Sequence, residues 1–366
     1  MHDEPTLPGR TGATLTLADL GWSPHFADQC DEAEGLLPMR IISVQRAMAT
    51  GLDTEGEHPL GFPPEMRAGG LAVGDWVLVE PETGRIAKVL ERVSVLSRRA
   101  AGVEAKPQLL AANVDTLFIT TSCNADFNAA RLERYLVLAL DAGVAPVIVL
   151  TKTDQAEDPE RYVAEARALS DKLDGVIALN AKDRAQIGLF SEWCGPGRTV
   201  AFVGSSGVGK STLINALTGS VQATADMRQD DAKGRHTTTA RSLHLIAGGG
   251  LVIDMPGMRE LGLHDVAGGI DELFEDITAL TTQCKFRDCK HLAEPGCAVQ
   301  GAVAEGKLDP ARLERWRKLK SEDKLNTTSM TVSRRRARAL SRAHKAEQDA
   351  SRNAKSAKPG KGPRKG

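Results

Sequence analysis

Residues 199–217 read TVAFVGSSGVGKSTLINAL, and this stretch decides the fold of the middle of the chain. The apolar run over 199–203 is typical of a buried strand, and the pattern GxxxxGKST follows it directly over 204–212. The three glycines let backbone N–H groups wrap a polyphosphate, and the residues after them predict a helix whose positive end adds to anion binding. Chance matches to the pattern occur, but the strand before it and the helix after it exclude most of them. We therefore expect a phosphate-binding loop for a nucleoside triphosphate.

Two side chains of this loop have separate expected roles. Lys210 is expected to reach the outer phosphates, and the Ser211 hydroxyl is expected to bind magnesium. The whole set expected to contact the nucleotide is Gly204, Ser205, Ser206, Gly207, Val208, Gly209, Lys210, Ser211 and Thr212.

The length and composition limit the number of domains and the class of protein. Its 366 residues suit two or three domains, and a hydrophobic content of 41% is enough for real cores. No apolar run is long enough to span a membrane, and residues 1–5 lack the basic and apolar regions of a signal peptide. The sequence therefore predicts a cytoplasmic protein.

The net charge of −1 is the sum of an acidic body and a strongly basic C-terminus. Residues 333–366 hold twelve Lys and Arg against Glu347 and Asp349, whereas residues 1–332 hold 35 basic and 46 acidic residues. A cationic tail suits a polyanion, most simply RNA. A merely solvated, disordered end of the same composition is the alternative.

Five regions follow from the pattern along the chain. Residues 1–38 look like an extension, in which Leu20, Trp22 and Phe26 form an amphipathic segment that can dock on a neighbouring surface. Short strands at 41–44, 75–79 and 85–90, separated by turn signals, predict a small β-barrel over 39–110, of the oligonucleotide-binding type or of another small type. The other regions are an α/β domain over 111–270, a helical module over 271–332 and the basic tail over 333–366.

Strands and helices alternate within the α/β region. We expect strands at 114–121, 145–150, 175–179, 199–203 and 251–254, and helices at about 128–142 and 159–173. This alternation predicts a parallel sheet.

A phosphate loop does not distinguish ATP from GTP, so base specificity must come from another motif. The tetrapeptide TKTD at 151–154 follows the strand over 147–150, at the sheet edge where ligands bind in such folds. The Asp154 carboxylate can accept hydrogen bonds from the ring N–H and the exocyclic amine of guanine, which adenine does not offer. Lys152 is expected to lie over the base and brace the loop. The residues expected to contact the base are Thr151, Lys152, Thr153, Asp154, Asn180, Ala181 and Lys182, the last three by presenting a backbone N–H to the guanine oxygen.

Two further segments complete a GTP site. The DMPG motif at 254–257 supplies Asp254 and Gly257 for magnesium and γ-phosphate sensing. A polar switch segment with Thr237, Thr238 and Thr239 offers magnesium ligands, of which we assign Thr237 and Thr238 together with Ser211. Because the base-reading motifs precede the phosphate loop, the GTPase domain is expected to be circularly permuted.

Three of the six cysteines are crowded into one short region with a histidine. Cys284, Cys289, His291 and Cys297 have the spacing C-x4-C-x-H-x5-C, which suits a closed tetrahedral zinc site with a structural role. A cluster of buried free cysteines is the alternative. The neighbouring Lys285, Arg287 and Lys290 are placed to contact RNA phosphates.

Taken together, these motifs resemble the small-ribosomal-subunit-dependent GTPase family RsgA, also called YjeQ, over residues 39 to about 330. The resemblance rests on GDWV at 74–77, NVD at 113–115, RYL at 134–136, GRHTTT at 234–239, DMPG at 254–257 and the cysteine cluster. It implies a monomeric, circularly permuted GTPase with an oligonucleotide-binding-like barrel and a helical zinc module. It further implies GTP hydrolysis to GDP and phosphate with Mg²⁺ on the small (30S) ribosomal subunit and its rRNA, stimulated by the subunit during late assembly.

The resemblance also implies a catalytic histidine, His236, because the position after the DxxG motif is Met258, which cannot polarise water. An ordering role for His236 in the switch is the alternative. The sequence departs from the family at Thr151, where Asn is usual, and at Asn180, where Ser is usual; we expect weaker GTP binding with unchanged specificity.

Two other function classes remain open from the sequence. An RNA-binding scaffold would use the nucleotide only to set affinity, and a P-loop enzyme acting on a metabolite would use ATP. The barrel and the cationic tail favour RNA over a metabolite.

Overall fold

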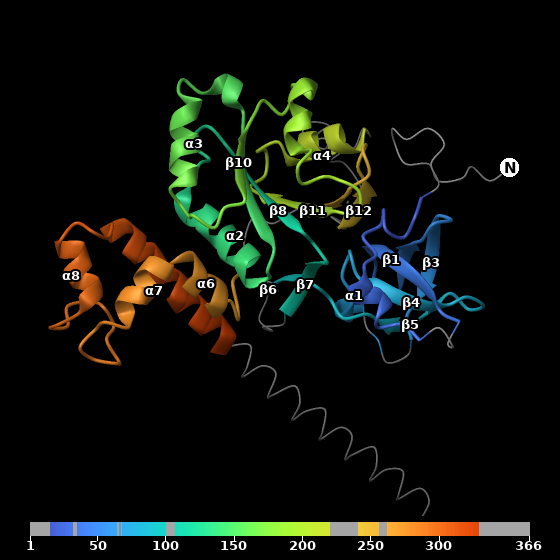
Figure 1. The fold of residues 1–366 in the computed structure, drawn as a ribbon, viewed down its shortest axis with the longest axis horizontal. Helices are drawn as coiled ribbons and strands as arrows, with labels where there is room; N and C mark the ends of the chain where they lie inside the picture. Colours follow the sequence, from blue (N-terminus) through green and yellow to red (C-terminus); the bar gives the residue numbers. More distant parts are fainter. Residues whose placement is uncertain are drawn as a thin grey trace, which may run out of the picture.

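The computed structural model describes residues 15–31, 35–63, 66, 68–99, 107–219, 241–255 and 262–328. His236, Thr237, Thr238, Gly257 and the basic tail lie outside these residues. Figure 1 shows a central sheet with the barrel on one side and the C-terminal helices on the other. Within the described ranges, no helix is long and apolar enough to cross a membrane.

The N-terminal part forms the expected barrel. Its strands are β1 (Leu37–Val44), β2 (Met48–Leu52), β3 (Glu57–Gly61), β4 (Trp76–Glu80) and β5 (Arg85–Val89). They follow the order β1-β2-β3-β5-β4, and β4 pairs back with β1, which closes the barrel. The interior is apolar, with Met39, Ile41, Leu60, Val77 and Ile86 all at most 5% exposed.

The central sheet is parallel, as the alternation of strands and helices predicted. Its strands are β10 (Gly175–Ala178), β9 (Ala145–Thr151), β8 (Thr116–Ser122), β11 (Thr199–Gly204) and β13 (Leu251–Asp254), in that spatial order. Alternate residues of the strands face two different cores: Leu117 and Ile119 pack with α2 (Ala129–Asp141), while Phe118 packs with α4 (Lys210–Thr218). The sheet therefore has helices on both faces, which leaves its carboxyl edge free to bind ligands.

One predicted helix was too long. We expected a helix over 159–173, but α3 runs only over Pro159–Arg167. The Ser170 hydroxyl accepts a hydrogen bond from the Lys172 N–H at 3.0 Å, and such a local side-chain bond competes with helix continuation.

The barrel and the central sheet share one hydrogen-bonded ladder. Strand β12 (Ser242–Leu245) pairs antiparallel with β13 on one side and with β1 of the barrel on the other, where Ser43 is the partner of Ser242. An 11-stranded sheet results. A separate hairpin of β6 (Val95–Arg99) and β7 (Pro107–Ala112) links the two regions along the chain.

The N-terminal segment docks as its amphipathic pattern indicated. The Trp22 ring meets Trp76 of the barrel edge-on at 4.7 Å between centroids, and Phe26 of the short helix α1 (Pro24–Ala27) lies 6.0 Å from the same ring. Leu20 is fully buried.

The C-terminal module consists of helices, of which α6 (Ala267–Leu273) packs directly on α2. The others are α7 (Glu275–Thr281), α8 (Ala298–Ala304) and a helical stretch over 310–328. Arg134 of α2 forms a bidentate ion pair with Glu322, and the buried Glu133 accepts a hydrogen bond from Arg315 at 2.8 Å. Charged pairs therefore hold this module against the α/β core.

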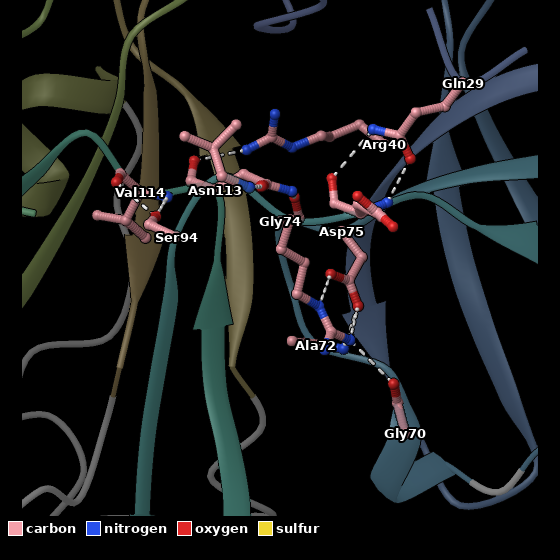
Figure 2. Close-up of polar contacts among 12 residues, drawn as sticks. Gln29, Arg40, Gly70, Ala72, Gly74, Asp75, Ser94, Asn113 and Val114 are labelled. Carbon is pink, nitrogen blue, oxygen red and sulfur yellow. Dashed lines mark hydrogen bonds and ion pairs between the residues drawn. The ribbon is translucent and has the colours of Figure 1, made fainter. Parts of the chain in front are cut away.

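A buried arginine joins the barrel, the N-terminal segment and the core. Figure 2 shows its contact with Asn113. The Arg40 guanidinium is 1% exposed and donates to the carbonyls of Leu20 and Asn113 and to the Thr199 hydroxyl, at 3.0–3.3 Å. Burial lowers the pKa of Arg40 to about 10, so it stays charged at neutral pH. Asn113 also donates from its side chain to the Gly74 carbonyl at 3.0 Å.

This network explains two of the sequence motifs. Gly74 has φ +92°, and a Cβ there would lie 2.2 Å from the Ala112 carbonyl oxygen. Asp75 is fully buried, accepting from the Ala72 N–H at 2.7 Å and from Arg92 at 2.6 Å. The GDWV and NVD motifs therefore build the joint between barrel and core.

We predict that Arg40→Met lowers the free energy of unfolding by about 3 kcal/mol, because it removes a buried cation whose acceptors then lose their donor. Urea unfolding followed by tryptophan fluorescence reports on this region directly. Arg46→Met, at an exposed site on the same barrel, is the matched control and should change stability little. Equal effects of the two substitutions would contradict a structural role for the Arg40 network.

Candidate nucleotide and metal sites

The phosphate loop lies at the carboxyl edge of the central sheet, between β11 and α4. Helix α4 begins at Lys210, and Gly209 precedes it with φ +102°. The Lys210 ammonium donates to the Gly204 carbonyl at 2.8 Å and to the Ser205 carbonyl, so it lies inside the loop. The geometry agrees with the strand, loop and helix expected from the sequence.

Each glycine of the phosphate loop is present for a different physical reason. A Cβ at Gly204 would lie 2.1 Å from the Thr120 carbonyl oxygen of β8, so this glycine is required by strand packing. Gly207 has φ +78° and open space around it, which leaves its backbone accessible to a ligand. A Cβ at Gly209 would lie 3.5 Å from Ala181 and 3.7 Å from Thr151, which shows how closely the predicted base-reading segments approach the loop.

Thr151 ties the base-reading segment to the phosphate loop. Its buried hydroxyl lies 2.6 Å from the Val208 carbonyl oxygen and 3.1 Å from that of Thr121. It has one proton for these two acceptors, and the shorter contact is the one to the loop. The threonine therefore braces the loop from the neighbouring strand.

We predict that Thr151→Val weakens GTP binding by about fivefold to tenfold, because one hydrogen bond to the loop, worth about 1 kcal/mol, is lost. The preference for GTP over ATP should not change. Competition binding with a fluorescent GTP analogue measures both quantities. Thr120→Val is the matched control, since the buried Thr120 hydroxyl has no hydrogen-bond partner among the described residues; an equal loss in both variants would contradict the bracing role.

The remaining residues that the sequence predicts to contact the base lie around the same edge. Lys152 has φ +58° and precedes a single 3-10 turn over Thr153–Gln155 that carries the exposed Asp154. In the second segment, the Asn180 N–H donates to Gln186 at 2.9 Å and the Lys182 N–H donates to the Asn180 side chain at 3.0 Å. No hydrogen bond within the described part of the chain occupies the Ala181 N–H, so it is the backbone donor that this segment can offer to a base.

Asp254 lies at the same edge of the sheet as the phosphate loop. It ends β13, where its Cα partners are Phe202 of β11 and Ser242 of β12. Parallel strands β11 and β13 end at the same edge, so Asp254 and the phosphate loop are neighbours. Gly257 and the switch threonines, predicted for the same site, lie outside the described residues.

The four predicted metal ligands come together in the C-terminal module. Their ligand atoms lie within 4.8 Å of one another. The Nδ1 atom of His291 is 3.5 Å from the Cys284 sulfur and 3.6 Å from that of Cys297, and the two sulfurs are 3.9 Å apart. A tetrahedral zinc with the usual bond lengths requires roughly 3.5 Å and 3.8 Å for such pairs. Burial lowers the pKa of His291, which favours the neutral imidazole that a metal needs.

A cationic pocket of about 390 Å³ adjoins this cluster. Arg287, Lys290, Arg317 and Lys320 line it beside Trp316. Spacing alone did not reveal Arg317 and Lys320, because they lie on the helical stretch over 310–328, well after the cysteines in sequence. Lys285, expected with this group, instead lies over the Phe286 ring at 5.5 Å.

Comparison with known proteins gives consistent matches. The family model described as RsgA GTPase matches residues 89–264. A protein of Mesorhizobium japonicum described as "Small ribosomal subunit biogenesis GTPase RsgA" is 55% identical over 328 residues, covering 88% of this chain and 94% of its own. One of Vibrio vulnificus described as "Small ribosomal subunit biogenesis GTPase RsgA 2" is 44% identical over 336 residues, covering 90% and 94%.

Two solved structures are similar in fold. YjeQ from Thermotoga maritima has a TM-score of 0.57 at 27% identity, covering 78% of this chain and 97% of its own. YloQ, described as a circularly permuted GTPase, has a TM-score of 0.53 at 26% identity, covering 79% and 95%.

Proposed function

The chain belongs to the RsgA family of GTPases, and from this premise we propose that it binds the small ribosomal subunit and hydrolyses GTP to GDP and phosphate there during late subunit assembly. Turnover is stimulated by the subunit and times the release of the protein. The observation that carries the proposal is the contact between the two nucleotide motifs, in which the Thr151 hydroxyl lies 2.6 Å from the phosphate-loop carbonyl of Val208.

In this proposal, each group of residues around the nucleotide has its own role. Asp154 accepts the two N–H groups of guanine, and the Ala181 N–H donates to the guanine oxygen. Lys210 and the loop N–H groups hold the phosphates, which fixes the γ-phosphoryl group for in-line attack. A magnesium ion, held by Ser211 with Thr237 and Thr238, would neutralise developing charge on the phosphates. His236 orients or deprotonates the attacking water.

The partner surface in this proposal is cationic. The pocket beside the cysteine cluster offers four Lys or Arg side chains to rRNA phosphates, and the tail over 333–366 adds twelve more basic residues. The protein acts as a monomer.

Co-sedimentation with purified small subunits tests the partner. Binding that is stronger with a non-hydrolysable GTP analogue than with GDP, and that weakens steeply with salt, is the expected result. Binding that is equal with both nucleotides would support an RNA-binding scaffold instead.

We propose that the Cys284, Cys289, His291 and Cys297 set holds one structural Zn²⁺. Cys289→Ser should lower the zinc content well below one ion per chain and lower the unfolding temperature of the C-terminal module, because metal binding contributes to folding there. GTP binding should persist. Zinc content by atomic absorption, with Cys30→Ser as a control remote from the cluster, checks this; full zinc occupancy in Cys289→Ser would contradict it.

A further inference from the structure

Two polar residues of β12, Ser242 and His244, lie on the same face of the sheet as Asp254 of the DMPG motif. In the register of the two strands, Ser242 is directly opposite Asp254, and His244 is opposite Val252, two pairs further from the nucleotide edge. Residues two apart on a strand share one face, and diagonal neighbours across strands lie within reach of long side chains. The Ser242 hydroxyl is 2.7 Å from Nε2 of His244, so the two side chains form one hydrogen-bonded pair beside Asp254.

The burial of His244 and the charges around it are compatible with a contact between its imidazole and the Asp254 carboxylate. His244 is half-buried, and burial lowers its pKa, while the negative charges of Asp254 and of Glu57 in the barrel act in the opposite direction. In its neutral form, the imidazole has one nitrogen that donates and one that accepts. It can hold both a hydroxyl and a carboxylate in place.

The pair lies on a strand that is hydrogen-bonded to a neighbour on each side. The strand lies between β13 and β1, and Ser43 of the barrel is the Cα partner of Ser242. The Ser43 hydroxyl donates to Thr50 at 3.0 Å, which continues the polar contacts into the barrel. The pair therefore lies at the junction between barrel and nucleotide site.

We propose that His244, together with Ser242, is a positioning residue that orients the Asp254 carboxylate toward the magnesium ion of bound GTP. The proposal rests on the proposed function as a GTPase and on the role in magnesium and γ-phosphate sensing that the DMPG motif predicts for Asp254. Partners that hydrogen-bond a metal-binding carboxylate typically contribute tenfold to a hundredfold to metal affinity. A residue that only packed at the junction would affect folding stability and would leave the magnesium dependence unchanged.

Binding titrations with a fluorescent GTP analogue separate the two roles. At a series of Mg²⁺ concentrations, His244→Ala should raise the concentration needed for half-maximal tight binding by about tenfold. Nucleotide affinity in EDTA should stay within about twofold of the original protein, because the loop and base contacts are intact. Ser242→Ala should cause a smaller shift in the same direction, and His244→Gln should restore part of the loss since its amide can still donate.

His58→Ala, on the barrel, is the histidine control. An unchanged Mg²⁺ dependence in folded His244→Ala, or a loss of affinity in EDTA equal to that in Mg²⁺, would overturn the proposal. If His244→Ala does not fold, Ser242→Ala decides it by the same criterion. Absence of Mg²⁺-dependent GTP binding in the original protein would instead refute the proposed function itself.

Discussion

Replacing Asp154 by asparagine should weaken GTP binding by about 100-fold or more. The carboxylate is proposed to accept two charge-assisted hydrogen bonds from guanine, each worth about 1.5–3 kcal/mol. An amide in its place can accept only one of them and presents a donor to the exocyclic amine. Binding of xanthosine triphosphate should rise in the same variant, because its 2-oxo group accepts from the new amide. Competition against a fluorescent nucleotide measures both changes.

Asp158→Asn is the control for this experiment. Asp158 is a nearby carboxylate that caps α3 by accepting from the Arg161 N–H, and asparagine caps helices equally well. Its nucleotide affinities should therefore not change. Unchanged GTP affinity in Asp154→Asn would refute the base-reading assignment and favour an ATP-using enzyme.

Replacing Lys210 by alanine should lower kcat for GTP hydrolysis by about 1000-fold, which corresponds to about 4 kcal/mol of transition-state stabilisation. The ammonium lies within the loop, where its charge is positioned before the phosphates develop negative charge. The fold should be retained, since the Lys210 ammonium bonds to carbonyls of the loop itself, those of Gly204 and Ser205. Single-turnover hydrolysis with saturating protein isolates this effect.

Lys318→Ala removes an exposed lysine that pairs with Glu314 in the same helical stretch, and it should leave intrinsic turnover unchanged. A Lys210→Ala variant with full turnover would contradict the assignment of the phosphate loop.

The sequence predicted the elements that have strong local signals. The strand over 199–203, the glycine loop and the helix after it formed as expected, because each is specified by residues next to one another. The metal ligands were predictable for the same reason, since spacing over a short stretch constrains where four side chains can meet.

Non-local features were not predictable in this way. The pairing of β12 with β1 depends on strands roughly two hundred residues apart, and nothing in either strand specifies its partner. Arg40 reads in the sequence as an ordinary strand residue, yet it is buried because three distant segments supply its acceptors. The helical pattern continues past Arg167, but beyond the end of α3 the Ser170 hydroxyl accepts the Lys172 N–H, a local bond that competes with a longer helix.

Steady-state hydrolysis of GTP and of ATP, with and without purified small ribosomal subunits at fixed magnesium and salt, tests the central claim most directly. The account predicts slow GTP hydrolysis by the protein alone, stimulation by an order of magnitude or more on adding subunits, and no comparable effect with ATP. Equal stimulation with ATP, or none with GTP, would contradict it.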